Sequence, residues 1–166
     1  PSIDNRRLTF TMKTIPDTET PMIAALAQAR SAAASDEVPV GAVIVDPQTG
    51  KLLAAGGNLV ETTSDPTAHA EIVVIRKACQ ALGQPRLDGY DLYVTLEPCA
   101  MCAQAIAHAR LRRLYFGAYD PKGGGVEHGA RVFDRQTCHH HPEIYGGIRE
   151  AEASDLLRDF FRSRRD

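Results

Sequence analysis

Residues 91–103 read Asp-Leu-Tyr-Val-Thr-Leu-Glu-Pro-Cys-Ala-Met-Cys-Ala, and this stretch decides the expected fold. Residues 92–96 are all β-branched, aromatic or aliphatic, which predicts a buried strand over 91–96. Pro98 suits the point where a helix starts, and mostly small and apolar residues continue to Ala109. We therefore expect a helix over 99–109. A strand that leads directly into a helix is typical of α/β folds.

The rest of the sequence continues this alternation. After Pro21, apolar residues recur at helical spacing, namely Met22, Leu26, Ala29 and Ala33. The apolar run 38–45 predicts a strand covered on both faces, and the turn residues 46–50 predict a hairpin to a strand at 51–55. Beyond it we expect a loop (56–67), a helix (68–83), a strand (114–118), a glycine-rich loop (121–125), a short strand near Ile144 and a helix around 153–161. This order predicts an α/β layered sheet.

Length and composition favour one domain. The chain has 166 residues, of which 43% are hydrophobic, and its net charge is −2, which excludes a globally basic nucleic-acid binder. We expect residues 1–20 to form a flexible tail and residues 21–166 to form the domain. No apolar run approaches the roughly 18–20 residues of a membrane helix, and the first twenty residues lack the apolar core of a signal peptide. A cytoplasmic protein with no membrane partner is expected.

Two short motifs carry the chemistry. His69 and Glu71 stand in Thr-Ala-His-Ala-Glu, and Cys99 and Cys102 stand in Pro-Cys-Ala-Met-Cys. One imidazole and two thiolates are ligands for Zn²⁺, and three protein ligands leave the fourth position open, as in catalytic zinc sites. Both motifs precede predicted helices, whose N-terminal N–H groups favour thiolate over thiol. We predict His69, Cys99 and Cys102 as metal ligands.

Glu71 is predicted to carry protons and not to bind the metal. On a regular helix, His69 and Glu71 would differ by roughly 200° in direction, but at a first turn both reach a site above the helix end. A carboxylate there takes a proton from activated water and passes it on. A Cys-x-x-Cys alone is more often structural or redox-active. A redox protein and a non-catalytic, zinc-stabilised RNA-binding module therefore remain as alternatives.

The joint pattern His-x-Glu and Pro-Cys-x-x-Cys is the signature of zinc-dependent nucleobase deaminases. The sequence resembles the bacterial tRNA-specific adenosine deaminase family, of the cytidine deaminase-like superfamily, over about residues 22–165. Besides the zinc motifs, the resemblance rests on Val-Pro-Val-Gly-Ala-Val-Ile-Val (38–45), Asp-Pro-Thr-Ala-His-Ala-Glu (65–71), Leu-Tyr-Val-Thr-Leu-Glu-Pro-Cys-Ala-Met-Cys-Ala (92–103), Phe-Gly-Ala-Tyr-Asp-Pro-Lys (116–122) and Leu-Leu-Arg-Asp-Phe-Phe-Arg (156–162).

The resemblance implies a three-layer α/β/α sandwich around a five-stranded mixed sheet, assembled as a homodimer with one Zn²⁺ per subunit. It implies hydrolytic deamination of adenosine to inosine at the wobble position of a tRNA anticodon stem-loop. His69, Cys99 and Cys102 would bind zinc, and Glu71 would be the proton shuttle. Three further residues would contact the substrate: Asn58, Ala70 and Asp120. Asn58 also follows two glycines, so its alternative role is that of a turn residue.

Several alternatives stay open. A deaminase of a free base or nucleoside, of guanine or cytosine type, would use the same zinc motif, and the particular tRNA is not specified. The segment 137–143, Thr-Cys-His-His-His-Pro-Glu, departs from the family. Adjacent residues on an extended chain point in opposite directions and chelate poorly, so we expect Cys138–His141 to be loop structure or an RNA contact before a second metal site. The arginines at 110–113 and 158–165 fit either phosphate contacts or a solvated surface.

Overall fold

The strand and the helix predicted from residues 91–109 are both present, as β3 and α4. The computed structural model describes residues 17–165 of the chain. In chain order its elements are α1 (Glu19–Ala34), β1 (Gly41–Val45), β2 (Leu52–Gly57), α2 (Val60–Thr63), α3 (Ala70–Leu82), β3 (Asp91–Leu96), α4 (Ala100–Ala109), β4 (Arg113–Ala118), the 3-10 helix η1 (Val132–Asp134), β5 (Glu143–Tyr145) and α5 (Glu150–Ser163).

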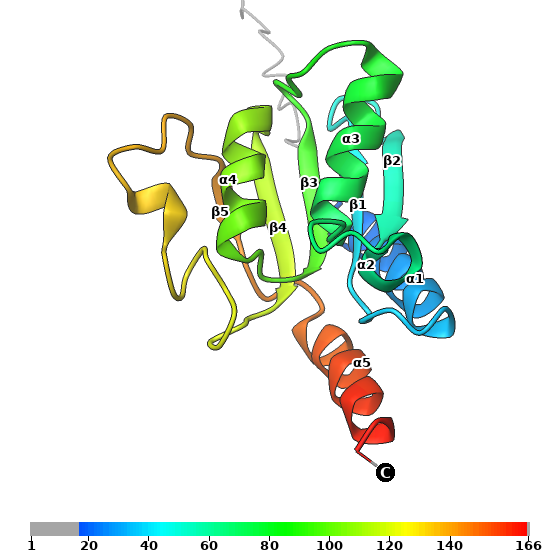
Figure 1. Ribbon diagram of the computed structural model, residues 1–166. Coiled ribbons are helices and arrows are strands. Elements are labelled where there is room, and N and C mark those ends of the chain that lie inside the picture. The colour runs from blue at the N-terminus through cyan, green and yellow to red at the C-terminus, as the bar shows by residue number, and fades with distance from the viewer. Residues whose placement is uncertain (1–16, 166) are drawn as a thin grey trace, which may run out of the picture.

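The strands form one mixed sheet in the order β2-β1-β3-β4-β5 (Figure 1). β1 is antiparallel to both β2 and β3, whereas β3–β4 and β4–β5 are parallel pairs. The turn at 46–50 makes the hairpin, and α4 supplies the crossover that a parallel β3–β4 pair needs. The predicted α/β class with a five-stranded mixed sheet is confirmed.

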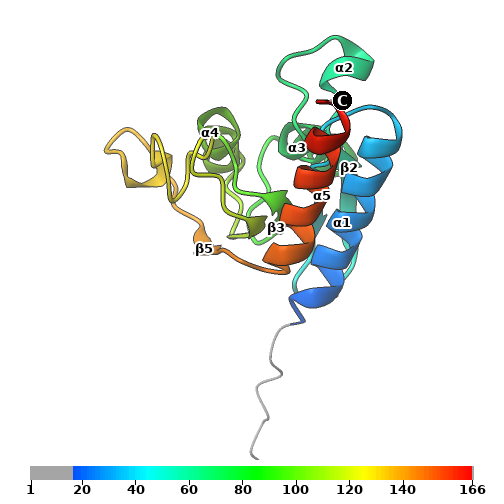
Figure 2. The same cartoon turned by 90° about the horizontal axis from the view of Figure 1, so that it is seen from below.

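Helices cover both faces of the sheet. α3 and α4 lie on one face, and α1 and α5 lie side by side on the other (Figures 1 and 2). In β1, Ala42 and Ile44 join the core under α3 and α4, whereas Val43 and Val45 join the core under α1. Successive side chains of a strand point to opposite faces, so a continuous apolar strand requires a layer on each side. The implied three-layer α/β/α sandwich is confirmed.

The first strand is shorter than predicted, since β1 begins at Gly41 and not at Val38. Pro39 has no N–H for a strand ladder, and the Val40 N–H donates to the nearby carbonyl oxygen of Val38 (2.8 Å). Gly41 then passes so close to α1 that a Cβ would clash with the Ala25 carbonyl oxygen. Residues 38–40 thus lie outside the sheet, and Val38 and Val40 line the cavity described below.

The predicted loop 56–67 is partly regular. β2 continues to Gly57, because two further pairs with β1 extend the hairpin. Residues 60–63 form the short helix α2, where Thr62 donates from its N–H (2.6 Å) and hydroxyl (2.9 Å) to the Glu37 carboxylate. Glu37 is fully buried, and it lies 25 residues earlier in the chain. No local sequence pattern could predict these hydrogen bonds, because the two residues are so far apart in the chain.

α1 begins at Glu19, two residues before the predicted start. The Asp17 carboxylate accepts hydrogen bonds from the N–H groups of Glu19 and Thr20 (3.1 Å each) and so caps the helix. These two residues therefore belong to the helix and not to the predicted tail; residues 1–16 of that tail lie outside the described residues. Between residues 17 and 165, no helix is both long enough and apolar enough to cross a membrane.

The close approach of Gly41 to α1 gives a stability prediction. Gly41→Ala should lower the free energy of unfolding by about 2–3 kcal/mol, because the methyl group meets backbone that cannot move aside without shifting the helix. Gly83→Ala is the matched control: its φ is +64° but nothing lies within 4 Å of the added Cβ, so only backbone strain of ~1 kcal/mol applies. Urea denaturation measures both. An equal loss for the two variants would contradict the packing argument.

Candidate active site

Two helix N-termini converge at one end of the sandwich. α3 and α4 lie together on one face and begin at the same end of the sheet (Figure 1). His69 is the residue before α3 and Cys99 the residue before α4; their carbonyl oxygens accept the first helical bonds, from Val73 (3.0 Å) and Ala103 (2.8 Å). Each helix begins slightly later than predicted, so the ligand side chains come from helix ends, as the sequence suggested.

The three predicted ligands come together. His69 Nδ1 lies 3.6 Å from Cys99 Sγ and 3.5 Å from Cys102 Sγ, and the three ligand atoms all lie within 4.8 Å of one another. Tetrahedral zinc with ordinary Zn–N and Zn–S bonds would hold nitrogen and sulfur about 3.6 Å apart. The donor set and its spacing therefore fit a Zn²⁺ ion with one position left for a non-protein ligand. The prediction of a zinc cofactor is confirmed, since the three predicted ligands are brought together at a spacing that suits zinc.

Hydrogen bonding among the ligands prepares the site for a cation. A hydrogen bond from the Cys102 thiol lowers the pKa of Cys99 to about 4, and the same bond raises the pKa of Cys102. The hydrogen bond to Cys99 raises the pKa of His69. Cys99 is thus a thiolate at neutral pH, and binding of a metal would release the proton that Cys102 still holds.

Glu71 lies in the first turn of α3, buried beside these ligands but not among the clustered ligand atoms. Burial raises its pKa to about 7, mainly because the charged form loses its hydration. A carboxyl group with a pKa near the working pH both accepts and donates protons, which is what general acid–base catalysis requires. The environment of Glu71 therefore suits the predicted proton carrier.

A cavity of about 320 Å³ opens onto this site. It brings together six of the seven predicted site residues, namely Asn58, His69, Ala70, Glu71, Cys99 and Asp120; its other lining residues are Val38, Val40, Leu96, Glu97 and Gly123. The seventh, Cys102, is fully buried in α4. The volume lies in the range of small-molecule pockets. Apolar side chains, a set of metal ligands and a few polar groups thus line one cavity.

Asn58, just past the end of β2, holds an unpaired polar atom at this cavity. Its backbone N–H donates to the Val40 carbonyl oxygen (3.0 Å), and the residue as a whole is 9% exposed. The side-chain Oδ1 is buried without a hydrogen-bond partner in the described part of the chain. Buried polar atoms are rarely left unpaired, so Oδ1 is positioned to accept a hydrogen bond from a bound ligand.

Sequence reasoning missed Glu97, which also lines the cavity. Its carboxylate is completely buried and accepts hydrogen bonds from residues 120–128. The sequence signal that could have identified Glu97 is its position directly before the Pro-Cys-x-x-Cys motif. Its partners follow more than twenty residues later, so the contact could not be read from the motif alone.

The His-rich segment 137–143 forms no second metal cluster among residues 17–165. Cys138 is buried, and its thiol donates to the His140 carbonyl oxygen (3.2 Å). His140 Nε2 lies 2.6 Å from the Leu111 carbonyl oxygen. These contacts hold the segment against the start of β4, so the expectation of loop structure here is confirmed.

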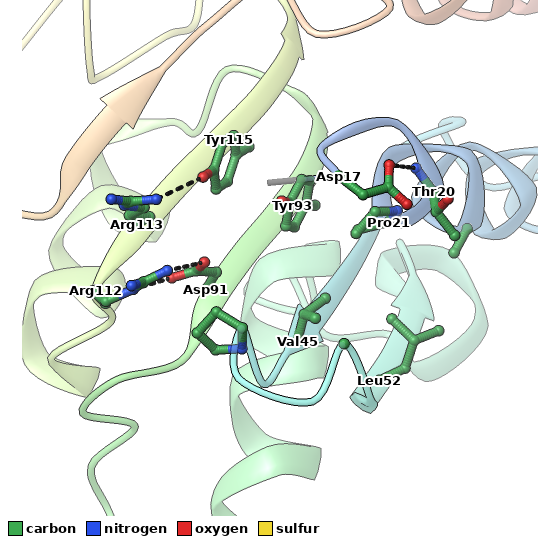
Figure 3. A pocket seen from close by; sticks show the side chains of 13 residues that line it. Asp17, Thr20, Pro21, Val45, Leu52, Asp91, Tyr93, Arg112, Arg113 and Tyr115 are labelled. Atoms are coloured by element: carbon green, nitrogen blue, oxygen red, sulfur yellow. Dashed lines mark hydrogen bonds and ion pairs between the residues drawn. The ribbon is translucent and has the colours of Figure 1, made fainter. Parts of the chain in front are cut away.

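A larger cavity, of about 550 Å³, lies at the start of β3 and β4, where Figure 3 shows its lining. Its two arginines are already paired: Arg112 donates to both oxygens of the buried Asp91 (2.8 and 2.7 Å), and Arg113 donates to Glu143 (2.6 Å) and Tyr115 (3.4 Å). None of the predicted zinc ligands lines it. The smaller cavity is therefore the candidate active site.

Most arginines of the two basic clusters also have carboxylate partners. Such pairs involve Arg112, Arg113, Arg158 and Arg164. Pairing lowers the positive charge that these surfaces offer to phosphate. The clusters thus favour the solvated-surface alternative over a strongly basic RNA-binding face.

Comparison with known proteins agrees with this geometry. Residues 16–118 match the family described as the cytidine and deoxycytidylate deaminase zinc-binding region. The tRNA-specific adenosine deaminase of Agrobacterium fabrum is 60% identical over 141 residues, which are 85% of this chain and 91% of that protein.

Two solved structures extend the comparison. One, from a study of A-to-I editing by tRNA:A34 deaminases at the wobble position, has a TM-score of 0.81 at 58% identity and covers 83% of this chain and 99% of its own. The guanine deaminase of Nitrosomonas europaea has a TM-score of 0.72 at 25% identity, covering 88% of this chain and 85% of its own. Since the zinc-binding region includes both ligand motifs and the Agrobacterium relative matches over most of its length, the chain belongs to the tRNA-specific adenosine deaminase family.

Proposed function

We propose that this protein converts adenosine to inosine at the wobble position of a tRNA anticodon by hydrolytic deamination. The observation that carries the proposal is the convergence of a three-ligand zinc site, a buried glutamate and an unpaired asparagine oxygen on one cavity. The relatives named for tRNA deamination and wobble editing support the nucleobase and its position.

When bound, zinc supplies a Lewis acid that makes water a nucleophile at neutral pH. His69, Cys99 and Cys102 hold the metal. Glu71 takes one proton from the attacking water and gives it to the adenine ring nitrogen. It then takes the second proton from the same oxygen and gives it to the departing amine. The water oxygen becomes the 6-oxo group of inosine, and ammonia leaves.

Three residues are proposed to bind the target nucleotide. The Asn58 Oδ1 accepts a hydrogen bond from the base, and the backbone of Ala70 lies along one edge of the base. Asp120, also in the cavity lining, contacts the RNA backbone. All three line the same cavity as Glu71, which supports a nucleotide held across the metal site.

The proposed macromolecular partner is the anticodon stem-loop of a tRNA. A base must leave its stack to enter such a cavity, and single-stranded loops allow this at lower cost than duplexes. We also propose a homodimer with one zinc ion in each subunit, one catalytic domain from the start of α1 at Glu19 onward, and the cytoplasm as the compartment where tRNA is modified.

The fold similarity to guanine deaminase favours one alternative, deamination of a free base. The wobble reaction is preferred because the tRNA deaminase relatives are 60% and 58% identical, against 25% for the guanine deaminase. Both activities would use the same zinc motif and the same proton carrier.

An anticodon stem-loop with adenosine at the wobble position tests the proposal directly. We expect inosine at that position and no product from a stem-loop with guanosine there. Free guanine, cytosine and adenosine serve as competitors and as separate substrates. Turnover of a free base alone would refute the RNA substrate.

Glu71→Gln tests the proton carrier. The amide cannot relay protons, so the rate of deamination should fall about 10²–10⁴-fold, while the chain still binds one zinc ion. Glu61→Gln is the matched control, because Glu61 is exposed on α2. Ammonia release and metal analysis are the measurements. Equal rates for Glu71→Gln and the unmodified protein would refute this role.

Asn58→Ala tests the proposed base contact. Loss of one hydrogen bond to substrate should lower kcat/KM for the stem-loop by about tenfold. The Oδ1 has no partner within the described chain, so the free energy of unfolding should change by less than about 1 kcal/mol. A large loss of stability with unchanged kcat/KM would show that Asn58 serves the fold instead.

A further inference from the structure

A single buried carboxylate holds the loop from which Asp120 and Gly123 line the cavity. Glu97 Oε1 accepts hydrogen bonds from the Asp120 N–H (3.2 Å) and from His128 Nδ1 (2.8 Å). Its Oε2 accepts from the N–H groups of Val126 (3.4 Å), Glu127 (3.2 Å) and His128 (3.2 Å). Five donors from residues 120–128, hereafter the wall loop, thus meet one side chain that is entirely buried.

The wall loop is packed directly on this carboxylate and on the start of α4. A Cβ on Gly124 would clash with Glu97 Oε2, and a Cβ on Gly125 would clash with the backbone of Ala100. The Gly125 N–H also donates to the Pro98 carbonyl oxygen (2.7 Å). Close approach therefore requires glycine at 124, which faces Glu97, and at 125, which faces the backbone at the start of α4.

Glu97 connects the two sides of the active-site cavity. It stands two residues before the ligand Cys99, and it holds the backbone of Asp120, the proposed contact to the RNA backbone. Asp120 in turn accepts hydrogen bonds at Oδ1 from the N–H groups of Lys122 (3.2 Å) and Gly123 (2.9 Å). Glu97, Asp120 and Gly123 all line the cavity. Glu97 thus ties Asp120 and residues 126–128 to the segment that carries Cys99, alongside the backbone bond from Gly125 to Pro98.

We infer that Glu97 is a positioning residue for substrate: it holds the wall loop, and with it Asp120, at the distance from the zinc ligands that the nucleotide requires. The inference rests on the proposed function for its substrate. His128, whose side chain is 35% exposed, supports Glu97 from the solvent side. Glu97 itself is not proposed to touch the reacting atoms.

The chemistry explains why a carboxylate is needed. An ionised carboxylate only accepts hydrogen bonds and has about four lone-pair sites, whereas a glutamine side chain places an NH₂ group on one side. In Glu97→Gln that NH₂ group would face either the Asp120 N–H or the three N–H groups at 126–128. One end of the wall loop would therefore lose its acceptor and meet a donor instead.

Glu97→Gln is the test, with Glu127→Gln as the matched control, because the Glu127 side chain is exposed on the same loop. We expect KM for the stem-loop to rise about tenfold, as one or two hydrogen bonds that fix the wall are lost. The kcat should stay within about threefold and zinc should stay at one ion per chain, because the ligands and Glu71 are unchanged. The control should leave KM, kcat and zinc content unchanged.

Hydrogen exchange measured by mass spectrometry provides a readout that needs no substrate. The amides of residues 120 and 126–128 should exchange faster in Glu97→Gln than in the unmodified protein or the control. His128→Leu removes one side-chain donor and leaves the four backbone bonds, so it should shift KM and exchange in the same direction by less. This His128 variant keeps the inference testable if Glu97→Gln folds poorly.

Three outcomes would overturn the inference: unchanged exchange in the wall loop, loss of zinc from Glu97→Gln, or a fall in stability with unchanged KM for the folded fraction. Failure of the proposed function is distinct from all three. In that case the unmodified protein does not deaminate the stem-loop, while exchange still reports whether Glu97 holds the loop.

Discussion

The active site depends on one geometric constraint: to hold a tetrahedral zinc ion, the nitrogen ligand must lie about 3.6 Å from each of the two sulfur ligands. The chain meets it by placing two helix starts next to each other. α3 and α4 occupy the same face of the sheet because β1, β3 and β4 are neighbours within it. The strand order that makes the sandwich is therefore also what brings His69 to Cys99 and Cys102 (3.6 and 3.5 Å).

Two buried glutamates beside this centre differ because their surroundings differ. Burial dominates at Glu71 and raises its pKa to about 7, so this group can exchange protons near neutrality. Burial would also raise the pKa of Glu97, but hydrogen bonds from His128 and from backbone N–H groups outweigh it and lower that pKa. Glu97 therefore stays ionised as an anchor, whereas Glu71 is suited to proton transfer. The number of donors around each carboxylate separates the two roles.

The predictions from sequence succeeded where the controlling residues are close together in the chain. The strand over 91–96, the helix after Pro98 and the two-faced burial of residues 41–45 follow from local pattern, and the structure contains them. The failures involve distant partners. The short helix α2 depends on Glu37, β1 starts late because Pro39 lacks an N–H and Gly41 packs against α1, and the anchoring of the wall loop depends on Glu97.

By itself, the sequence determined the class of chemistry and the alternating order of strands and helices. The residue types at 69, 71, 99 and 102 specify zinc ligands and a proton carrier, because few other side chains can do these tasks. Only the tertiary structure decided which polar groups face the cavity: it left Asn58 Oδ1 unpaired and turned Glu97 toward the wall loop. The reason is physical. Burial and hydrogen-bond partners are set by elements packed from far along the chain, and no local pattern encodes them.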